Sequence, residues 1–165
     1  MKKILFVILG FVSGFAAQAG EGDTYFSFSG GALYKNAISS EFTFEKEISH
    51  HGGWEVGLDY YNNCFGKIER DSNGIKIQHH AILFQGAYKR VLIRYKNSNI
   101  RWRIAAGAGV NEKGFTCSVT PGLEYNHTFS NGIQFFILDK NQFSFWSSNK
   151  SWFRTGLLVG IKIPF

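Results

Sequence analysis

The sequence predicts an all-β protein: an eight-stranded antiparallel up-and-down transmembrane β-barrel that follows an N-terminal signal peptide. Beyond residue 20, apolar and polar side chains alternate in successive runs, which is typical of strands whose two faces meet unlike environments. The less apolar face is rich in Gly, Ala, Ser and Thr with scattered charges, as in the cramped interior of a small barrel. The last run is amphipathic and ends in the aromatic residue Phe165.

The N-terminal segment, residues 1–19, is predicted to be a cleaved signal peptide. Two lysines precede an apolar run over residues 4–15, and an Ala-x-Ala sequence ends at Ala19. The alternative is a transmembrane anchor, but the run is shorter than the roughly 20 residues that a spanning helix needs. Residues 20–165 are therefore expected to form the barrel domain.

The composition is typical of β-strands and gives no sign of a nucleic-acid, metal or cofactor site. Of the 165 residues, 17% are aromatic and 19 are Gly, while Pro is scarce. The formal net charge of +6 is spread along the chain without a basic stripe or a nucleic-acid motif, so no direct nucleic-acid binding is predicted. Cys64 and Cys117 lie far apart in the sequence, and both a disulfide and two free thiols remain open. The spacing of the cysteines fits no metal site, and no cofactor is predicted.

Four alternating runs occupy the first half of the predicted barrel. In the first, Phe26 and Phe28 alternate with serines, and in the fourth only Leu83 breaks the alternation. Polar and Gly-rich turns separate the runs, and a longer polar loop precedes the fourth. The runs are Thr24–Tyr34, Ser40–Ile48, Gly53–Tyr61 and Gln78–Tyr88.

Four more runs complete the barrel in the second half. In the last one, Leu157, Val159 and Ile161 alternate with Leu158 and Gly160. The seventh is apolar but carries a polar interruption, "LDKNQ". The runs are Arg101–Val110, Phe115–Phe129, Gly132–Phe145 and Thr155–Phe165.

The charges on the less apolar face predict a network of ion pairs inside the barrel. Buried charges must be paired or they cost several kcal/mol each, and side chains fill the lumen of an eight-stranded barrel, so a filled interior is favoured over a conducting channel. The residues predicted for this network are Glu41, Glu55, Asp59, Arg101, Arg103, Glu124 and Arg154, and Glu45 and Lys162 share their phase. The tryptophans are expected to form girdles at the membrane interfaces; they are Trp54, Trp102, Trp146 and Trp152.

The terminal aromatic residue predicts the compartment. A strand ending in an aromatic residue is a feature of outer-membrane barrels, so Phe165 is expected to serve as an assembly signal. The predicted location is the outer membrane of a Gram-negative bacterium, and the predicted partners are outer-membrane lipids and the barrel assembly machinery. A soluble, lipocalin-like exported barrel that binds a small ligand is the alternative architecture.

The C-terminal sequence "DKNQFSFWSSNKSWFRTGLLVGIKIPF" resembles the end of the conjugative-transposon TraO family of Bacteroidetes mobile elements. "GGWEVGLDYYN" and "QHHAILFQGAYKRV" resemble the middle strands of that family more loosely. The resemblance implies an outer-membrane component of a conjugative DNA-transfer apparatus, with a structural or interaction role and other conjugation proteins as partners. The motif positions are Trp146, Phe153, Thr155, Gly160, Ile161 and Lys162.

Catalysis is the third class of function to weigh, because some small outer-membrane barrels modify lipid A. His127 and Ser130 with Glu124 nearby are the candidate residues, since a nucleophilic site needs a hydroxyl within reach of an imidazole and an acid. An odd separation places His127 and Ser130 on opposite faces of a strand, so no catalytic site is predicted. The pairs His50–His51 and His79–His80 lack a third ligand at a useful spacing, so no metal site is predicted either.

Overall fold

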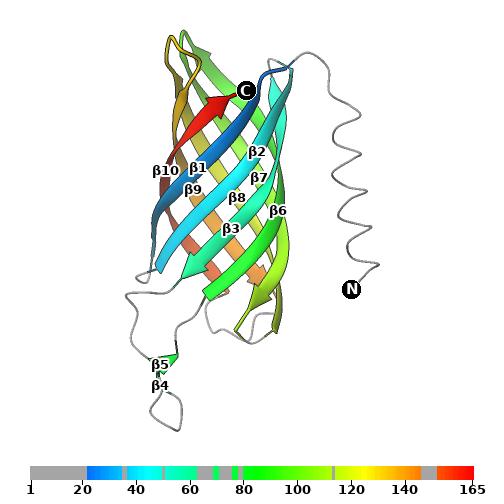
Figure 1. The fold of residues 1–165 in the computed structure, drawn as a ribbon, viewed down its shortest axis with the longest axis vertical. Coiled ribbons are helices and arrows are strands. Elements are labelled where there is room, and N and C mark those ends of the chain that lie inside the picture. The colour runs from blue at the N-terminus through cyan, green and yellow to red at the C-terminus, as the bar shows by residue number, and fades with distance from the viewer. Residues whose placement is uncertain are drawn as a thin grey trace.

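The structure of the chain is a computed structural model. Eight long strands form a closed antiparallel barrel, which confirms the predicted fold class (Figure 1). The residues that the structure describes are 22–34, 37–49, 51–62, 69–70, 76–77, 80–112, 114–145 and 152–165. The barrel strands are β1 (Thr24–Leu33), β2 (Ala37–Ser49), β3 (Gly52–Asn62), β6 (His80–Tyr95), β7 (Ser98–Asn111), β8 (Gly114–Thr128), β9 (Gln134–Phe145) and β10 (Phe153–Pro164).

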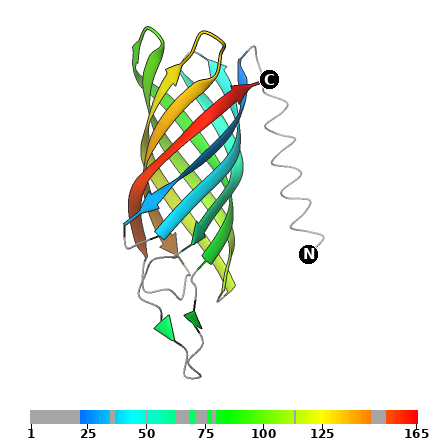
Figure 2. The ribbon, with the colours of Figure 1, turned by 60° about the vertical axis from the view of Figure 1, so that its left-hand side comes forward.

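The strands follow one another around the barrel in chain order, and β1 closes it against β10. In the closing pair, Phe28 lies opposite Ile161 and Tyr25 lies opposite Pro164. A separate two-stranded hairpin, β4 (Glu69–Arg70) with β5 (Lys76–Ile77), lies between β3 and β6 in the sequence, beyond one end of the barrel (Figures 1 and 2). The connectivity is therefore up-and-down, as predicted.

The opposite end of the barrel is called the termini end, because β1 begins and β10 ends there (Figure 2). The hairpin between β6 and β7 at this end is tight: only Lys96 and Asn97 connect the two strands. Lys96 has a φ of 45°, in the left-handed region that such a turn uses. The connection from β3 to β6, which carries the small hairpin, lies at the other end.

The two faces of the barrel have opposite chemistry. Side chains on the outer face are large, apolar and exposed; Phe28 is 60% exposed and Leu157 59%. The next residue along the chain, Leu158, points inward and is fully buried, as are Glu45 and Lys162. This inversion, with apolar side chains outside and charges inside, agrees with the predicted phase of the strands.

Side chains fill the lumen. An apolar cluster occupies part of it: Leu33, Ala37, Tyr61, Ala81, Phe136, Leu138 and Leu158. At Gly160 a Cβ atom would lie only 2.6 Å from the ring of Phe136 and 2.4 Å from the carbonyl oxygen of Phe28, so a side chain there would collide with the packed interior. The interior is therefore a packed core of unusual polarity.

β6 is much longer than its predicted run, and β9 stays regular through a polar stretch. β6 continues beyond Tyr88 to Tyr95, through a bulge between Val91 and Ile93 that shifts its register against β7. The seventh predicted run, Gly132–Phe145, corresponds to β9, and its polar stretch "LDKNQ" does not interrupt the strand, because the residues there alternate regularly between the two faces. In both places the pairing with neighbouring strands stabilises a segment whose local sequence looks irregular.

Several predictions fall outside the described residues, namely the signal peptide, Trp146 and Cys64. Among the residues that the structure describes, no helix has the length and apolar character needed to cross a bilayer.

Candidate functional site: an ion-pair network in the lumen

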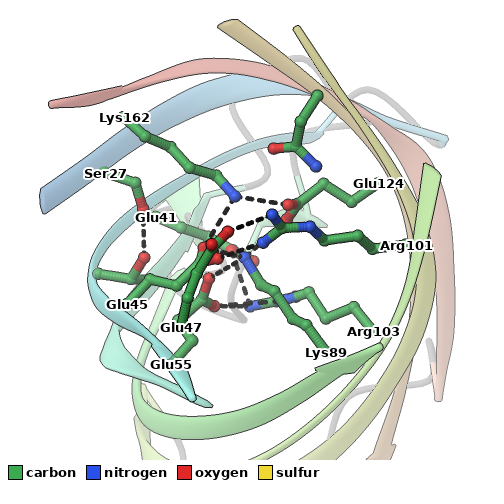
Figure 3. Close-up of polar contacts among 12 residues, drawn as sticks. Ser27, Glu41, Glu45, Glu47, Glu55, Lys89, Arg101, Arg103, Glu124 and Lys162 are labelled. Atoms are coloured by element: carbon green, nitrogen blue, oxygen red, sulfur yellow. Dashed lines mark hydrogen bonds and ion pairs between the residues drawn. The ribbon is translucent and has the colours of Figure 1, made fainter. Parts of the chain in front are cut away.

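Charged side chains from seven of the eight barrel strands meet inside the barrel, and Figure 3 shows those that surround Lys89 and Arg103. Alternation brings them there, because in each strand the charged residues occupy inward-facing positions flanked by outward-facing ones. We call this set the lumen network; its members are Glu41, Glu45, Glu47, Glu55, Asp59, Lys89, Arg101, Arg103, Glu124, Lys140 and Lys162.

Lys89 lies at the centre of three carboxylates. Its Nζ atom is 2.7 Å from Glu45, 2.5 Å from Glu55 and 2.7 Å from Glu124. The three acids come from β2, β3 and β8, and their facing oxygen atoms lie within 4.8 Å of one another. The ammonium group thus occupies the position in which a cation would otherwise be needed to hold three negative charges together.

Lys162 and Arg101 extend this centre toward the termini end. Lys162, on the closing strand β10, pairs with Glu45 at 2.8 Å and with Glu124 at 2.6 Å. Arg101 pairs with Glu45 at 2.7 Å and also with Glu47. These contacts connect β10 to β2 and β8 across the lumen.

A second centre forms around Glu41. Arg103 pairs with Glu41 at 3.0 Å and with Glu55 at 2.6 Å, so it joins the two centres. Lys140, on β9, pairs with Glu41 at 2.8 Å and with Asp59 at 2.7 Å. Lys140 also donates a hydrogen bond to the hydroxyl of Ser39.

The electrostatics of the lumen network favour a rigid, closed interior. Removing a charge from water costs several kcal/mol, and only close pairing with satisfied hydrogen bonds compensates for this cost. The network carries six carboxylates and five cations, and every member has a partner of opposite charge within 3.0 Å. The members other than Glu47 are almost completely buried, so paired charges fill the lumen at this height.

Six of the seven residues predicted for the network lie in it, and Arg154 does not. Arg154 lies over the ring of Tyr61 at 3.9 Å and donates a hydrogen bond to Ser144. The prediction missed Glu47, Lys89 and Lys140. Regular alternation continued through "LDKNQ" would have identified Lys140, and continuing β6 past Tyr88 would have identified Lys89.

The candidate catalytic residues do not meet. The Nδ1 atom of His127 is 2.9 Å from the hydroxyl of Ser98, whereas Ser130 lies in an exposed turn. Glu124 points into the lumen and pairs with Lys89 and Lys162. Of the histidine pairs, His50 and His79 are outside the described residues.

Phe165 closes an aromatic cluster on the outer face. Its ring stacks on Phe26, with centroids 4.4 Å apart, and lies 5.5 Å from Phe44. Its backbone N–H donates a hydrogen bond to the carbonyl of Thr24, so the last residue is still attached to β1. The motif positions of the C-terminal resemblance that the structure describes lie in β10: Phe153, Thr155, Gly160, Ile161 and Lys162.

The comparisons with known proteins support the predicted fold but identify no family. No family model matches the chain, and no curated protein sequence does. Among solved structures, the chain is similar to one described as "De novo design of transmembrane beta-barrels", with a TM-score of 0.50 and 10% sequence identity. The match covers 88% of this chain and 98% of the designed one. The chain is thus structurally similar to a transmembrane β-barrel, and the resemblance to the TraO family is left without support from a family model.

Proposed function

We propose that the chain is an outer-membrane β-barrel whose role is structural or binding. The observation that carries this proposal is the inversion of its two faces. Exposed Phe, Leu, Ile and Val side chains cover the barrel strands outside, where a soluble barrel would place polar groups. A hydrocarbon environment makes this surface favourable, and a closed barrel satisfies every backbone hydrogen bond inside such an environment.

The aromatic side chains support the same environment. Trp54, Tyr88 and Trp102 contact one another on the outer face near the termini end, with centroids 4.9 Å and 5.5 Å apart along the row. Tryptophan and tyrosine favour the headgroup region of a bilayer, because their rings are apolar and their N–H or O–H groups remain solvated. We therefore place one membrane interface at this row.

The lumen argues against transport and the site geometry argues against catalysis. The lumen network and the apolar cluster fill the interior, so a continuous water path would require paired charges to separate. The triad candidates lie apart. The function is therefore assigned to the ends of the barrel, where connections and rim side chains can contact partners.

The orientation follows from the hairpins. Outer-membrane barrels have short periplasmic turns and longer external loops. The termini end carries the tight β6–β7 turn, so we place it in the periplasm, and we place the β3–β6 connection with its small hairpin outside the cell.

Membrane fractionation and folding assays test the proposal. The processed protein should be recovered with outer membranes and should migrate differently in gels before and after heating, as folded barrels do. Recovery in the soluble periplasmic fraction would contradict the membrane assignment and favour the small exported ligand-binding barrel. A shift of one acyl chain in lipid A upon expression would favour a lipid-modifying enzyme.

A narrower proposal rests on the C-terminal resemblance alone. If the TraO-like motif reflects common descent, the barrel is a component of a conjugative DNA-transfer apparatus and its partners are other conjugation proteins. Deleting the gene in a donor strain should then lower transfer frequency without affecting growth, and transfer should return on complementation. Normal transfer in the deletion strain, or a gene neighbourhood without conjugation genes, would refute the narrower proposal and leave the barrel assignment intact.

A further inference from the structure

Two cations, Lys46 on β2 and Arg90 on β6, lie on the outer face near the termini end, where Lys46 is half-buried and Arg90 is exposed. Of the cationic side chains that the structure describes, these two alone form no ion pair, side-chain hydrogen bond or ring contact. An anion from outside the chain can therefore pair with them without displacing an existing partner.

No acid lies beside these cations among the described residues. The cross-strand neighbours are Thr24 and Trp54 for Lys46, and Gly52 and Trp102 for Arg90. The acids nearest to Lys46 in the sequence, Asp23 and Glu47, line the polar cavity at the mouth of the lumen, on the inner side of the wall. Glu47 is paired there with Arg101. The positive charge on the outer face is thus left uncompensated at this point.

A hydroxyl donor lies between the two cations. A Cβ atom on Gly52 would be 3.4 Å from the hydroxyl oxygen of Tyr88, so this hydroxyl lies over the glycine. Arg90 is directly opposite Gly52, on the same strand as Tyr88. A guanidinium and a phenol O–H in this arrangement can both donate hydrogen bonds to one phosphate group.

The spacing of the cations and the surface above them fit one lipid molecule. Lys46 and Arg90 are separated by β3 and by two residues along the strands, so their Cα atoms lie about 12 Å apart and both long side chains can reach a group between them. From this position β3 runs toward the middle of the barrel wall, and its next outward side chains are Val56 and Leu58. These side chains offer an apolar track for acyl chains directly above the polar groups.

We propose that Lys46, Tyr88 and Arg90 bind the phosphate of an anionic phospholipid whose acyl chains lie along Val56 and Leu58. This site rests on the proposed function, which places the row of Trp54, Tyr88 and Trp102 at a membrane interface and the termini end in the periplasm. The ligand is then a phospholipid of the periplasmic leaflet, not lipid A of the external one. A headgroup without an ammonium group of its own is favoured, because an ammonium group would be repelled by the two cations.

Tryptophan quenching by brominated phospholipid tests the site, because Trp54 and Trp102 flank it. The refolded barrel is placed in phosphatidylcholine vesicles that contain a minor fraction of brominated phosphatidylglycerol, and unlabelled lipids compete with the quencher. Each lysine or arginine strengthens binding to an anionic lipid about fivefold, so phosphatidylglycerol should compete at least tenfold better than phosphatidylcholine. Phosphatidylethanolamine should compete no better than phosphatidylcholine. Equal competition by all three phospholipids, or stronger competition by lipid A than by phosphatidylglycerol, would overturn the site.

The variants connect the preference to the named residues. Lys46→Gln and Arg90→Gln should each lower the preference for phosphatidylglycerol about fivefold, and the double variant should abolish it. In vesicles of phosphatidylcholine alone, the single variants should unfold like the wild type. The control, Lys96→Gln, removes a charge from the turn at the same end of the barrel and should leave the preference unchanged.

The outcomes separate this site from the membrane assignment. A wild-type barrel that does not insert into vesicles, as heat-modifiable migration would reveal, would contradict the proposed function. Insertion without a preference for phosphatidylglycerol would contradict the lipid site alone. An equal loss of preference in Lys96→Gln and in Lys46→Gln would indicate attraction by the overall charge of this end and would also refute the site.

Discussion

Replacing Lys89 by Met tests whether the lumen network holds the barrel together. The variant keeps most of the side-chain volume and removes the ammonium group that contacts Glu45, Glu55 and Glu124 at 2.5–2.7 Å. Three carboxylates whose oxygens lie within 4.8 Å of one another would then face each other without the central cation. We expect a large loss of stability with an unchanged fold.

The ion pairs that remain in the variant determine how large the loss of stability should be. Breaking a buried ion pair by removing one partner costs about 3–5 kcal/mol. In the variant Glu45 and Glu124 keep Lys162, and Glu55 keeps Arg103, so none of the three acids becomes wholly unpaired. The lower end of the range applies, and the free energy of unfolding should fall by about 3 kcal/mol.

The assay is an equilibrium urea titration of the barrel in lipid vesicles, followed by tryptophan fluorescence. Arg90→Met is the matched control, because Arg90 is the exposed neighbour of Lys89, and it should shift the free energy by about 0.5 kcal/mol or less. Adding Glu124→Gln to Lys89→Met should restore about 1–2 kcal/mol, since it removes one of the repelling charges. A loss below about 1 kcal/mol, or further loss in the double variant, would refute the reasoning.

Four further outcomes can be measured. Deleting Phe165 should lower the amount of protein in outer membranes at matched expression while inserted molecules keep heat-modifiable migration; equal amounts of both forms in the soluble periplasm would contradict the membrane assignment. Val159→Arg, on the outer face, should destabilise the barrel in vesicles by about 2–4 kcal/mol, and a neutral result in the same urea titration would place that face away from lipid. His127→Ala and Ser130→Ala should leave the lipid A acylation pattern of expressing cells unchanged, as mass spectrometry would report; a pattern that depends on either residue would establish catalysis. Ala19→Arg should leave an unprocessed precursor, and N-terminal sequencing that finds Met1 on the wild-type protein would refute the signal peptide.

The alternation of side chains predicted the fold class because its cause is local. Successive side chains of a strand point to opposite faces, so a run such as Leu157 to Ile161 reveals both environments without knowledge of its neighbours. The same logic placed Glu41, Asp59 and Arg103 inside the barrel, where the structure has them.

What alternation could not predict depends on contacts between strands. Whether β6 stops at Tyr88 or continues to Tyr95 is decided by hydrogen bonds to β7, and a bulge allows the continuation. Lys89 was missed for this reason. Arg154 has the predicted inward phase, but among the described residues its height in the barrel brings it to Tyr61 and Ser144 and not to an acid. This height depends on the stagger of neighbouring strands.

The position of Lys162 on the last strand has a consequence for assembly. β10 closes the barrel by pairing with β1, and this seam has to form in one register. A slip of one residue would turn the ammonium group toward the outside. A slip of two would keep it inside but displace it along the strand by about 7 Å, too far to reach Glu45 and Glu124. Only one register of β10 against β1 therefore brings Lys162 within reach of both carboxylates. The buried charges thus favour correct closure of the barrel.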